Sequence, residues 1–466
     1  MKHHHALIRS LIALATAVAL GGCSELGIYD LTESQARDAD FAVGSLEADA
    51  GDEQITLSWN DPADDRFSAV QIEYSPGAGV LTVDPGTQSI TIGSLTNGTS
   101  YQFDLYAIAD SGPVGPAVTV MATPSLPSFP DDEWHSAASV SRRRLVIDGR
   151  EYDEVFEGFP LMVQLDSARI AYTEAAADGS DLRFFDAGNT SELFYEIESW
   201  DPSGESIVWV RVPALAAGSR DYIWMYWGGG ATTSFADASE VWSEYELVLH
   251  LSDDLTDSSP NARNGSAVGS PVYAEGPAGT AIRVGDEAIA SAYVNVPGYA
   301  SDFDHTTLGA YTVELWMLGD DVPATDTTNG PLMGQSFFSM GWDNTNTLYT
   351  GTYHFRHTTE NWTPVAASPL AAETWYYAAA VFDGTAGTAT SYRDGGVDNQ
   401  LTEYPGTVGD RASYLRIGED GGIGDIFDGM VDEVRITHQT RSAAWIAAQY
   451  RSMTDALVIF GEVEQQ

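Results

Sequence analysis

Short runs in which apolar and polar residues alternate dominate this chain. Clear examples are residues 54–59 (QITLSW), 69–75 (AVQIEYS) and 102–109 (QFDLYAIA). Such alternation is typical of strands with one buried face, and Gly-containing turn signals separate the runs. A 3.6-residue period is rare, and the clearest case is a short helix predicted at 442–450 before a last strand at 456–463. The pattern therefore predicts an all-β protein.

The N-terminus carries an export signal. An apolar run at 11–20 (LIALATAVAL) is too short to span a bilayer, and it follows Lys2 and precedes Gly21-Gly22-Cys23. This arrangement resembles a bacterial lipobox. The resemblance implies that residues 1–22 are a lipoprotein signal peptide, that Cys23 is acylated, and that Ser24 directs sorting to the outer membrane. An ordinary signal peptide cleaved near Cys23 is the alternative. Residues 23–39 are polar and predict a tether from the lipid.

Length and charge narrow the choice of partners. The 466 residues suggest about three domains. With 21 Lys and Arg against 68 Asp and Glu, the net charge is −47, which repels nucleic acid and anionic lipid surfaces. We therefore expect no nucleic-acid partner, and membrane contact through the lipid anchor alone. Cys23 is the only cysteine, so disulfides and thiolate chemistry are absent from the mature chain. An acidic surface of this kind is typical of solubility in salty water, where charges are screened.

Residues 40–123 contain at least five predicted strands separated by turns. Trp59 in LSWNDP, and Tyr101 in LTNGTSYQFDLYAIADSG (95–112), resemble the buried tryptophan and the corner tyrosine of a fibronectin type III domain. The resemblance implies an immunoglobulin-like sandwich that serves as a spacer. Residues 124–132, with three prolines, predict a semi-stiff linker.

Residues 133–245 predict a second β domain. The segments DGSDLRFF, YEIESWD, WVRVP and IWMYWG occur in an order that resembles domain of unknown function 2341. That family occurs in bacterial surface proteins beside lectin-like domains. Some members accompany proton-channel proteins of the TolQ/ExbB family, which implies an envelope complex as one candidate partner. Trp224 and Tyr226 share one strand face and Trp227 the other, and one of these faces is predicted to be core.

Four polar residues of this domain suggest an active site. They are Asp178, Asp181, Arg183 and Glu198. The alternative, that they cap turns and pair with one another, is favoured because structural ion pairs are common.

Residues 246–466 carry YTVELWML (311–318), TWYYAAAVFDG (374–384), FDGMVDEVRI (427–436) and RSAAWIAAQY (441–450). These pieces resemble a laminin-G-like or concanavalin-A-like jelly-roll lectin domain. The resemblance implies a structural calcium ion held by Asp432 and by an acid in the loop at 254–265. Asp257 and Asp254 are the loop candidates, since calcium prefers carboxylate and carbonyl oxygens. The alternative is that these aspartates cap turns.

Sugar binding requires exposed aromatic residues with polar neighbours. Trp362 with Asn361, and Trp342 with Asp343 and Asn344, lie in polar segments of loop character. They are the predicted ligand-binding residues, although tryptophans are more often buried.

Histidine metal sites are not indicated by the pattern. His354 and His357 point to opposite faces of a predicted strand and so do not form a metal pair. His250 is interpreted as a strand residue with a satisfied hydrogen bond.

Glycoside hydrolases of this fold place paired carboxylates on one strand. Here Glu314 is followed on its face by Trp316 and Leu318, so no enzyme is predicted. The sequence instead predicts a non-catalytic cell-surface protein that binds polysaccharide or glycoprotein for adhesion or capture. Two alternatives stay open, a structural or accessory protein of an envelope complex and a carbohydrate-active enzyme, because jelly rolls serve all three uses.

Overall fold

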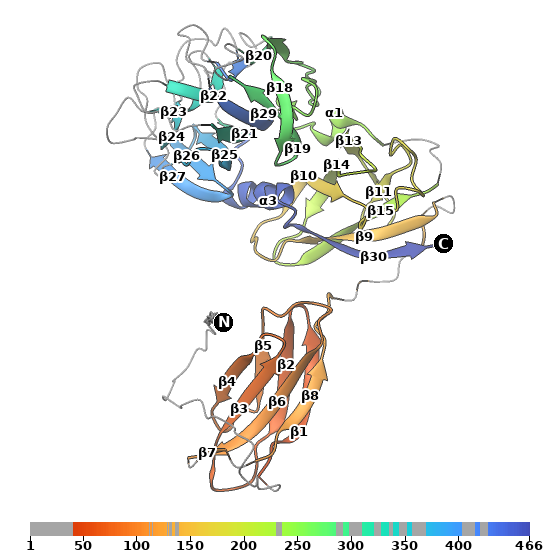
Figure 1. Cartoon of the computed structure of the whole chain (residues 1–466), viewed down its shortest axis with the longest axis vertical. Helices are drawn as coiled ribbons and strands as arrows, with labels where there is room; N and C mark the ends of the chain where they lie inside the picture. The colour runs from red at the N-terminus through yellow and green to blue at the C-terminus, as the bar shows by residue number, and fades with distance from the viewer. Residues whose placement is uncertain are drawn as a thin grey trace, which may run out of the picture. The chain divides into compact units, whose positions relative to one another are not determined.

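The computed structural model describes most of the chain beyond the N-terminal segment. The described residues are 41–110, 112–113, 115–127, 129, 133–135, 139–229, 235–285, 292–297, 310–320, 328–334, 339–343, 352–356, 370–402, 415–419 and 427–466. The chain divides into two compact units, Met1–Asp131 and Asp132–Gln466, and strands dominate both (Figure 1). Among these residues, no helix is long and apolar enough to cross a membrane.

The first unit is a sandwich of two antiparallel sheets. One sheet has the order β1 (Gly44–Gly51), β2 (Gln54–Asn60), β5 (Ser89–Ile92). The other has the order β4 (Gly79–Val83), β3 (Phe67–Ser75), β6 (Tyr101–Ala109), β7 (Gly112–Pro113), with β8 (Val118–Ala122) also on β6. Trp59 is buried between the sheets, and the Tyr101 hydroxyl accepts a hydrogen bond from the Thr96 N–H at 3.0 Å. The predicted immunoglobulin-like sandwich, with its corner tyrosine, is confirmed.

The second domain also has two antiparallel sheets. The smaller has the order β10 (Phe156–Leu165), β14 (Ser206–Leu215), β13 (Tyr195–Ser199). The larger has the order β12 (Glu192–Leu193), β11 (Arg183–Phe185), β15 (Arg220–Trp227), β9 (Ser141–Asp148), β30 (Val458–Gln465). Strand β30 comes from the end of the chain, a segment that the sequence analysis placed in the third domain. The polypeptide thus returns to the second domain after completing the third.

The third domain is a two-sheet jelly roll. Its eight-stranded sheet has the order β18 (Val272–Gly276), β19 (Gly279–Val284), β29 (Gly429–Thr437), β21 (Ala310–Gly319), β25 (Trp375–Asp383), β26 (Thr388–Arg393), β27 (Gly396–Thr402), with β16 (Leu247–Leu249) also on β29. Its six-stranded sheet has the order β17 (Ser266–Val268), β20 (Tyr293–Val296), β28 (Leu415–Ile417), β22 (Thr328–Gly334), β23 (Ser339–Asp343), β24 (Thr352–Arg356). Leu315, Val431 and Ile417 lie in the core between the two sheets. The predicted concanavalin-A-like fold is confirmed.

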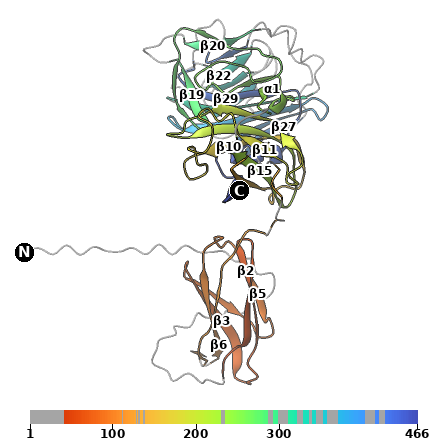
Figure 2. The same cartoon turned by 90° about the vertical axis from the view of Figure 1, so that its right-hand side faces the viewer.

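The central strands of the eight-stranded sheet, β29, β21 and β25, are buried on both faces, while the edge strands β18 and β27 are partly exposed. Side chains alternate along β21, so Leu315 enters the jelly-roll core while Trp316 points the other way. Trp316 and Tyr377 belong to the same hydrophobic core as Trp209 and Trp242 of the second domain. In Figure 2 the jelly-roll strands adjoin the strands of the second domain directly. One continuous apolar core therefore joins the second and third domains, and we call their shared boundary the seam.

Helix α3 (Ala443–Met453) closes the seam where β10 forms a sheet edge. The Ser442 hydroxyl caps the helix by accepting from the Trp445 N–H, as expected for the predicted helix. Gln449 donates to the Pro160 carbonyl at 3.2 Å, and the Ser452 hydroxyl accepts from the Met162 N–H at 2.8 Å. The helix thereby satisfies backbone groups that an edge strand would otherwise leave unpaired. A second helix, α1 (Ala238–Val241), has four residues and lies directly before Trp242, a residue of the shared core.

The aromatic strand β15 is covered on both faces. Trp227 packs in the core of the second domain, while Trp224 and Tyr226 face the other way and are also buried. The Arg142 guanidinium lies 4.0 Å from the Trp224 ring centre, and Arg144 lies 4.6 Å from the same ring. Cation–π contacts therefore cover the face opposite the core.

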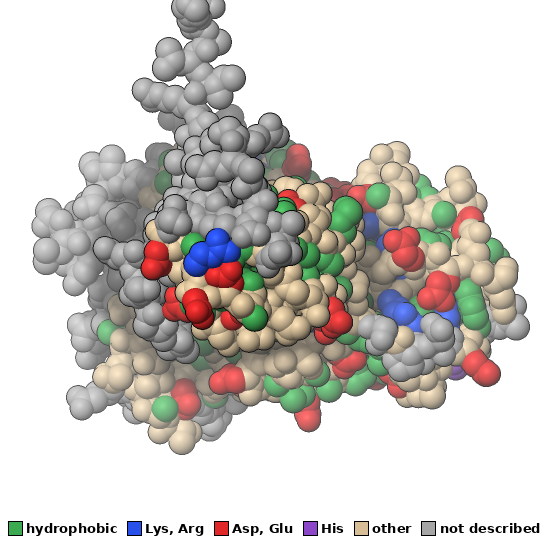
Figure 3. All heavy atoms as spheres, turned by 90° about the horizontal axis from the view of Figure 1, so that it is seen from below, with side chains coloured by type: hydrophobic (Ala, Val, Ile, Leu, Met, Phe, Trp, Pro, Cys, Tyr) green, Lys and Arg blue, Asp and Glu red, His purple; other side chains and the backbone are tan. Residues whose placement is uncertain are grey.

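Acidic side chains are spread over the face shown in Figure 3, and basic ones are few. On this face the charge excess is a general property of the surface rather than one recognition patch.

Candidate functional site

Three aspartates were predicted to hold calcium, and the structure places them separately. The two carboxylate oxygens of Asp257 accept hydrogen bonds at 2.7–3.0 Å from the N–H groups of Val248, Ser259 and Arg263 and from the Ser259 hydroxyl. Asp254 accepts from the Thr256 N–H in an exposed turn. Both residues cap turns, the alternative that the sequence analysis left open. Calcium binding at these residues stays a prediction.

Most of the residues predicted to bind a sugar or carry lipid lie outside the described part of the chain. These are Cys23, Asn344, Asn361 and Trp362. Trp342 and Asp343 occupy the end of strand β23, in the six-stranded sheet, and only their place in that strand is described. Sugar binding by these residues therefore also stays a prediction.

Three of the four polar residues singled out in the second domain have structural roles. Asp178 caps a turn at Ser180, Asp181 accepts from two backbone N–H groups, and Arg183 pairs with Glu192. Glu198 differs from them. Its side chain is 1% exposed and it faces His250 across the seam.

The seam holds a cluster of charged side chains, which we call the seam cluster. It consists of Glu196 and Glu198 from β13, His250 directly after β16, and Asp432, Glu433 and Arg435 from β29. The two glutamates of β13 are two residues apart and so lie on one strand face. The cluster thus combines groups from the second domain, the third domain and their connection.

A β-bulge in β29 turns the third-domain residues toward the seam. The register between β29 and β21 shifts between the pair Glu314–Arg435 and the pair Trp316–Asp432. On β29 this shift includes Glu433, whose φ is +53°. A bulge interrupts alternation. Val431 and Val434 therefore still face the jelly-roll core. The side chains of Asp432, Glu433 and Arg435 face the seam. Positive φ at a non-glycine residue is strained, by about 1–3 kcal/mol, and such strain gathers at functional sites.

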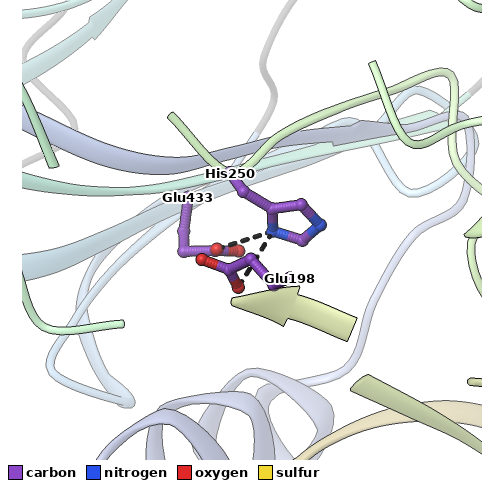
Figure 4. Close-up of side chains that lie close together, drawn as sticks. All are labelled: Glu198, His250 and Glu433. Atoms are coloured by element: carbon purple, nitrogen blue, oxygen red, sulfur yellow. Dashed lines mark hydrogen bonds and ion pairs between the residues drawn. The ribbon is translucent and has the colours of Figure 1, made fainter. Parts of the chain in front are cut away.

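His250 is the centre of the seam cluster. Its Nδ1 lies 2.7 Å from Glu433 Oε1 and 3.5 Å from Glu198 Oε2, and Figure 4 shows both carboxylates approaching this one ring nitrogen. Its Nε2 lies 3.2 Å from Glu196 Oε2. Trp209 and Trp242 pack against the imidazole, with ring centres 5.8 and 5.5 Å away. The imidazole is therefore held in one orientation by three carboxylates and two indoles.

Each glutamate is itself fixed by further hydrogen bonds. Glu198 accepts from the Trp209 indole N–H at 2.7 Å and from the Ser252 hydroxyl. Glu196 accepts from the Trp242 indole N–H and the Ser258 hydroxyl, both at 2.6 Å.

On the third-domain side, Glu433 accepts from the Arg435 guanidinium, which stacks 4.3 Å from the Trp209 ring centre. The geometry of the cluster is thus set before any ligand binds.

The charges of the cluster strongly affect one another. Burial raises the pKa of Glu198 to about 8, and burial together with Glu433 raises the pKa of Asp432 well above its ordinary value. Burial opposes ionisation of Glu433, but His250 and Arg435 outweigh it and lower its pKa. Burial also opposes the charge on His250, but Glu433, Glu196 and Glu198 outweigh it and raise its pKa well above the usual range. The metal-free cluster therefore holds protons on His250 and Glu198 near neutral pH.

This arrangement has two chemical uses. It can hold protons in a buried network, or it can hold a metal ion, because Glu198, His250 and Glu433 each offer a ligand atom and these atoms lie within 4.8 Å of one another. No other set of three or more His, Cys, Asp or Glu side chains in the described ranges meets that spacing. The predicted calcium ligands Asp254, Asp257 and Asp432 therefore do not form such a group.

The sequence analysis named Glu198, His250 and Asp432 separately, with His250 interpreted as hydrogen-bonded, but it missed the cluster that they form. The available signals were the Glu196–Glu198 alternation and the histidine that ends the apolar run 247–251. Neither signal says that the two segments meet.

A surface cleft of about 360 Å³ is lined by Glu154, Glu157, Glu244, Arg441 and Trp445, among others. Its aromatic ring is not available for stacking, because Trp445 is 4% exposed and the Arg441 guanidinium lies 3.8 Å from its ring centre. Arg441 also pairs with Glu244 at 2.9 Å. The cleft therefore lacks the free aromatic surface that a sugar ring would need.

Three protein families match successive parts of the chain. Residues 41–120 match the fibronectin type III domain, residues 178–263 match the domain of unknown function DUF2341, and residues 287–447 match the concanavalin A-like lectin/glucanases superfamily. The three resemblances inferred from sequence motifs are thereby confirmed. A comparison with curated proteins finds no match.

Solved structures show partial similarity. Domain 4 of AbnA, a GH43 extracellular arabinanase from Geobacillus stearothermophilus solved with arabinotriose, is 19% identical, with 44% of this chain and 98% of that chain covered and a TM-score of 0.35. The binding domain of Paraclostridial Mosquitocidal Protein 1 is 12% identical (45% and 52% covered, TM-score 0.37). The binding domain of Botulinum neurotoxin DC, solved with rat synaptotagmin II, is also 12% identical (45% and 52% covered, TM-score 0.38). The chain spans about half the length of these last two structures.

Proposed function

We propose that this chain is a lipid-anchored protein of the outer membrane that binds carbohydrate or glycoprotein without catalysis, in adhesion or capture. The observation that carries the proposal is the jelly roll of the third domain, whose sequence matches the concanavalin A-like lectin/glucanases superfamily. The lipobox around Cys23 supports the anchor, and the fibronectin type III domain supplies a spacer between anchor and lectin-like module.

The packing of the jelly roll restricts where a glycan can bind. The outer face of the central strands of the eight-stranded sheet is buried in the seam, where Trp316 and Tyr377 pack against the second domain. A glycan that reaches the jelly roll must therefore use the six-stranded sheet, the exposed edge strands or the loops. Trp342 belongs to β23 of that six-stranded sheet, which supports its assignment as a binding residue together with Trp362.

A second candidate function follows from the same seam. The jelly roll already uses one sheet face to contact a protein domain, so a structural or accessory role in an envelope complex, including one of the TolQ/ExbB type, is the alternative. A carbohydrate-active enzyme is the third candidate, and no described side-chain pair favours it.

The test is binding of the purified protein to a panel of polysaccharides, with calcium and with chelator. We expect saturable binding that a free sugar competes, weakened by Trp362→Ala and by Trp342→Ala. Trp134→Ala is the matched control, because Trp134 packs edge-on against Tyr226 in the second domain. Absence of binding under both conditions would refute the lectin assignment in favour of protein partners, and turnover of a glycan would show an enzyme.

A further inference from the structure

The two acidic ligand candidates in the seam cluster approach a single nitrogen. Glu198 comes from β13 of the second domain and Glu433 from β29 of the third, and both carboxylates face Nδ1 of His250 (Figure 4). A neutral imidazole nitrogen flanked by carboxylate oxygens is a common ligand set for zinc and related ions.

The spacing suits a small metal ion. Zinc lies about 2.0–2.2 Å from nitrogen and carboxylate ligands, so tetrahedral ligand atoms are roughly 3.4 Å apart. The observed separations from Nδ1 are 2.7 Å to Glu433 and 3.5 Å to Glu198. Side-chain movements of about an ångström or less would therefore bring these two oxygens and Nδ1 to bonding distance.

The surroundings have the arrangement of groups that support metal ligands. A metal-binding histidine generally donates its other ring N–H to a carboxylate, which fixes the ring and its tautomer. His250 Nε2 faces Glu196 in this way, at 3.2 Å. Both carboxylate ligands are fixed too, Glu433 by Arg435 and Glu198 by the Trp209 indole N–H. Each of the three candidate ligands thus has an outer hydrogen-bonding partner of the kind that orients metal ligands.

A separate observation points to a missing ligand. The Asp432 side chain is fully buried, and its Oδ1 has no hydrogen-bond partner among the described residues. Its Oδ2 accepts from the Ala278 N–H at 3.1 Å. The charges of Glu433, Glu198 and His250 all act on Asp432, which lies next to Glu433 in β29 and so belongs to the cluster. A buried carboxylate oxygen without a partner is costly unless an ion or a proton satisfies it.

We propose that Glu198, His250 and Glu433 bind one divalent transition-metal ion, with zinc the best fit and Asp432 the candidate fourth ligand. The ion joins the second domain to the third. Calcium fits less well, because it takes six to eight oxygen ligands and the centre of this site is a nitrogen. The proposal goes beyond carbohydrate binding and does not depend on it.

The test is zinc titration of the purified, chelator-stripped protein by calorimetry. We expect one zinc ion per chain, and at least a tenfold loss of affinity in Glu198→Gln and in Glu433→Gln. Cobalt, which is coloured when tetrahedral, should show visible bands in the wild type that both variants lose. Glu192→Gln is the matched control, since Glu192 pairs with Arg183 in the second domain and lies outside the cluster.

Two outcomes would overturn the proposal. One is a wild-type protein that binds no stoichiometric zinc, and the other is a Glu198→Gln variant that binds zinc as tightly as the wild type does. Circular dichroism checks that each variant is folded. If Glu433→Gln does not fold, Glu198→Gln still tests the proposal. Glutamine keeps the shape of glutamate but lacks the negative charge that binds the metal ion.

Discussion

In the metal-free protein, the seam cluster should make folding stability fall as the pH rises. Burial raises the pKa of Glu198 to about 8, and the surrounding carboxylates raise that of His250. A group with a raised pKa keeps its proton in the folded state after the unfolded chain has lost it. Its stabilising contribution is therefore complete below its ordinary pKa and is lost as the pH rises toward the folded value.

All the titratable groups that face one another across the seam contribute to this dependence of stability on pH. The pKa of Asp432 is raised like those of Glu198 and His250, so its contribution also declines with rising pH. The pKa values of Glu196 and Glu433 are lowered, so their contributions are present above the ordinary range and decline as the pH falls below it. The permanent charge of Arg435 supports the ionised Glu433. Stability should therefore be greatest in mildly acidic solution.

The contribution of Glu198 to this loss of stability can be worked out on its own. One retained proton changes the unfolding free energy by about 1.4 kcal/mol per pH unit. Between pH 6 and pH 8, with the folded group beginning to ionise near pH 8, the loss is about 2 kcal/mol. His250 and Asp432 add to this loss, since their pKa values shift in the same direction.

The assay is urea unfolding followed by tryptophan fluorescence at pH 6 and pH 8, with chelator present. We expect the wild type to be less stable at pH 8. Glu198→Gln, which binds no proton at either pH, should lose about 2 kcal/mol less than the wild type over the same interval. A wild type equally stable or more stable at pH 8, or a variant with an unchanged pH response, would refute the reasoning.

Two further predictions concern other parts of the chain. Tyr101→Phe removes the acceptor of the Thr96 N–H, which is partly exposed, and should cost the first unit about 0.5–1.5 kcal/mol, measured by urea unfolding. Calcium, if held as the sequence predicts, should raise the melting temperature of the wild type, and Asp432→Ala should abolish that gain. An equal calcium response in both proteins would contradict the assignment of Asp432.

Much of the fold could be predicted because its signals are local. In the first unit, alternation places β2 and β6 within about a residue of their observed ends, and Trp59 identifies the core face. Helix α3 follows from the 3.6-residue period that predicts a helix at 442–450, close to the observed Ala443–Met453. In these segments the same residues decide both the local conformation and the buried face, so no distant information is needed.

The position of the last strand could not be predicted in this way. Its alternation indicates a strand but does not select a sheet, and β30 pairs with β9, more than 300 residues earlier. The burial of Trp224 on the face opposite the core has a similar cause, because arginines from the neighbouring strand β9 cover it. Partners distant in sequence decide both features.

The seam cluster was missed for the same reason and for one more. His250 and Glu433 are 183 residues apart, and no pattern links them. Strict alternation along VDEVRI would also place Asp432 and Glu433 on opposite faces. The bulge at Glu433 brings them together, and its positive φ has no sequence signature at a glutamate. The cluster therefore depends on a local departure from the rule that sequence reasoning applies.

The seam does not need these charges for stability. Trp209, Trp242, Trp316 and Tyr377 already supply an apolar contact between the two domains, and buried ion pairs are often no better than hydrophobic residues of similar volume. A strained backbone and an unpartnered carboxylate oxygen coincide at the same place, and departures of this kind are expected at functional positions. In our proposal, a proton and a metal ion compete for Nδ1 of His250, so acid would release the metal and leave His250 paired with the carboxylates inside an apolar contact that still joins the domains. The same side chains would then serve both states, which explains why the cluster is charged and why Glu196, Glu198 and Glu433 are each held by further hydrogen bonds.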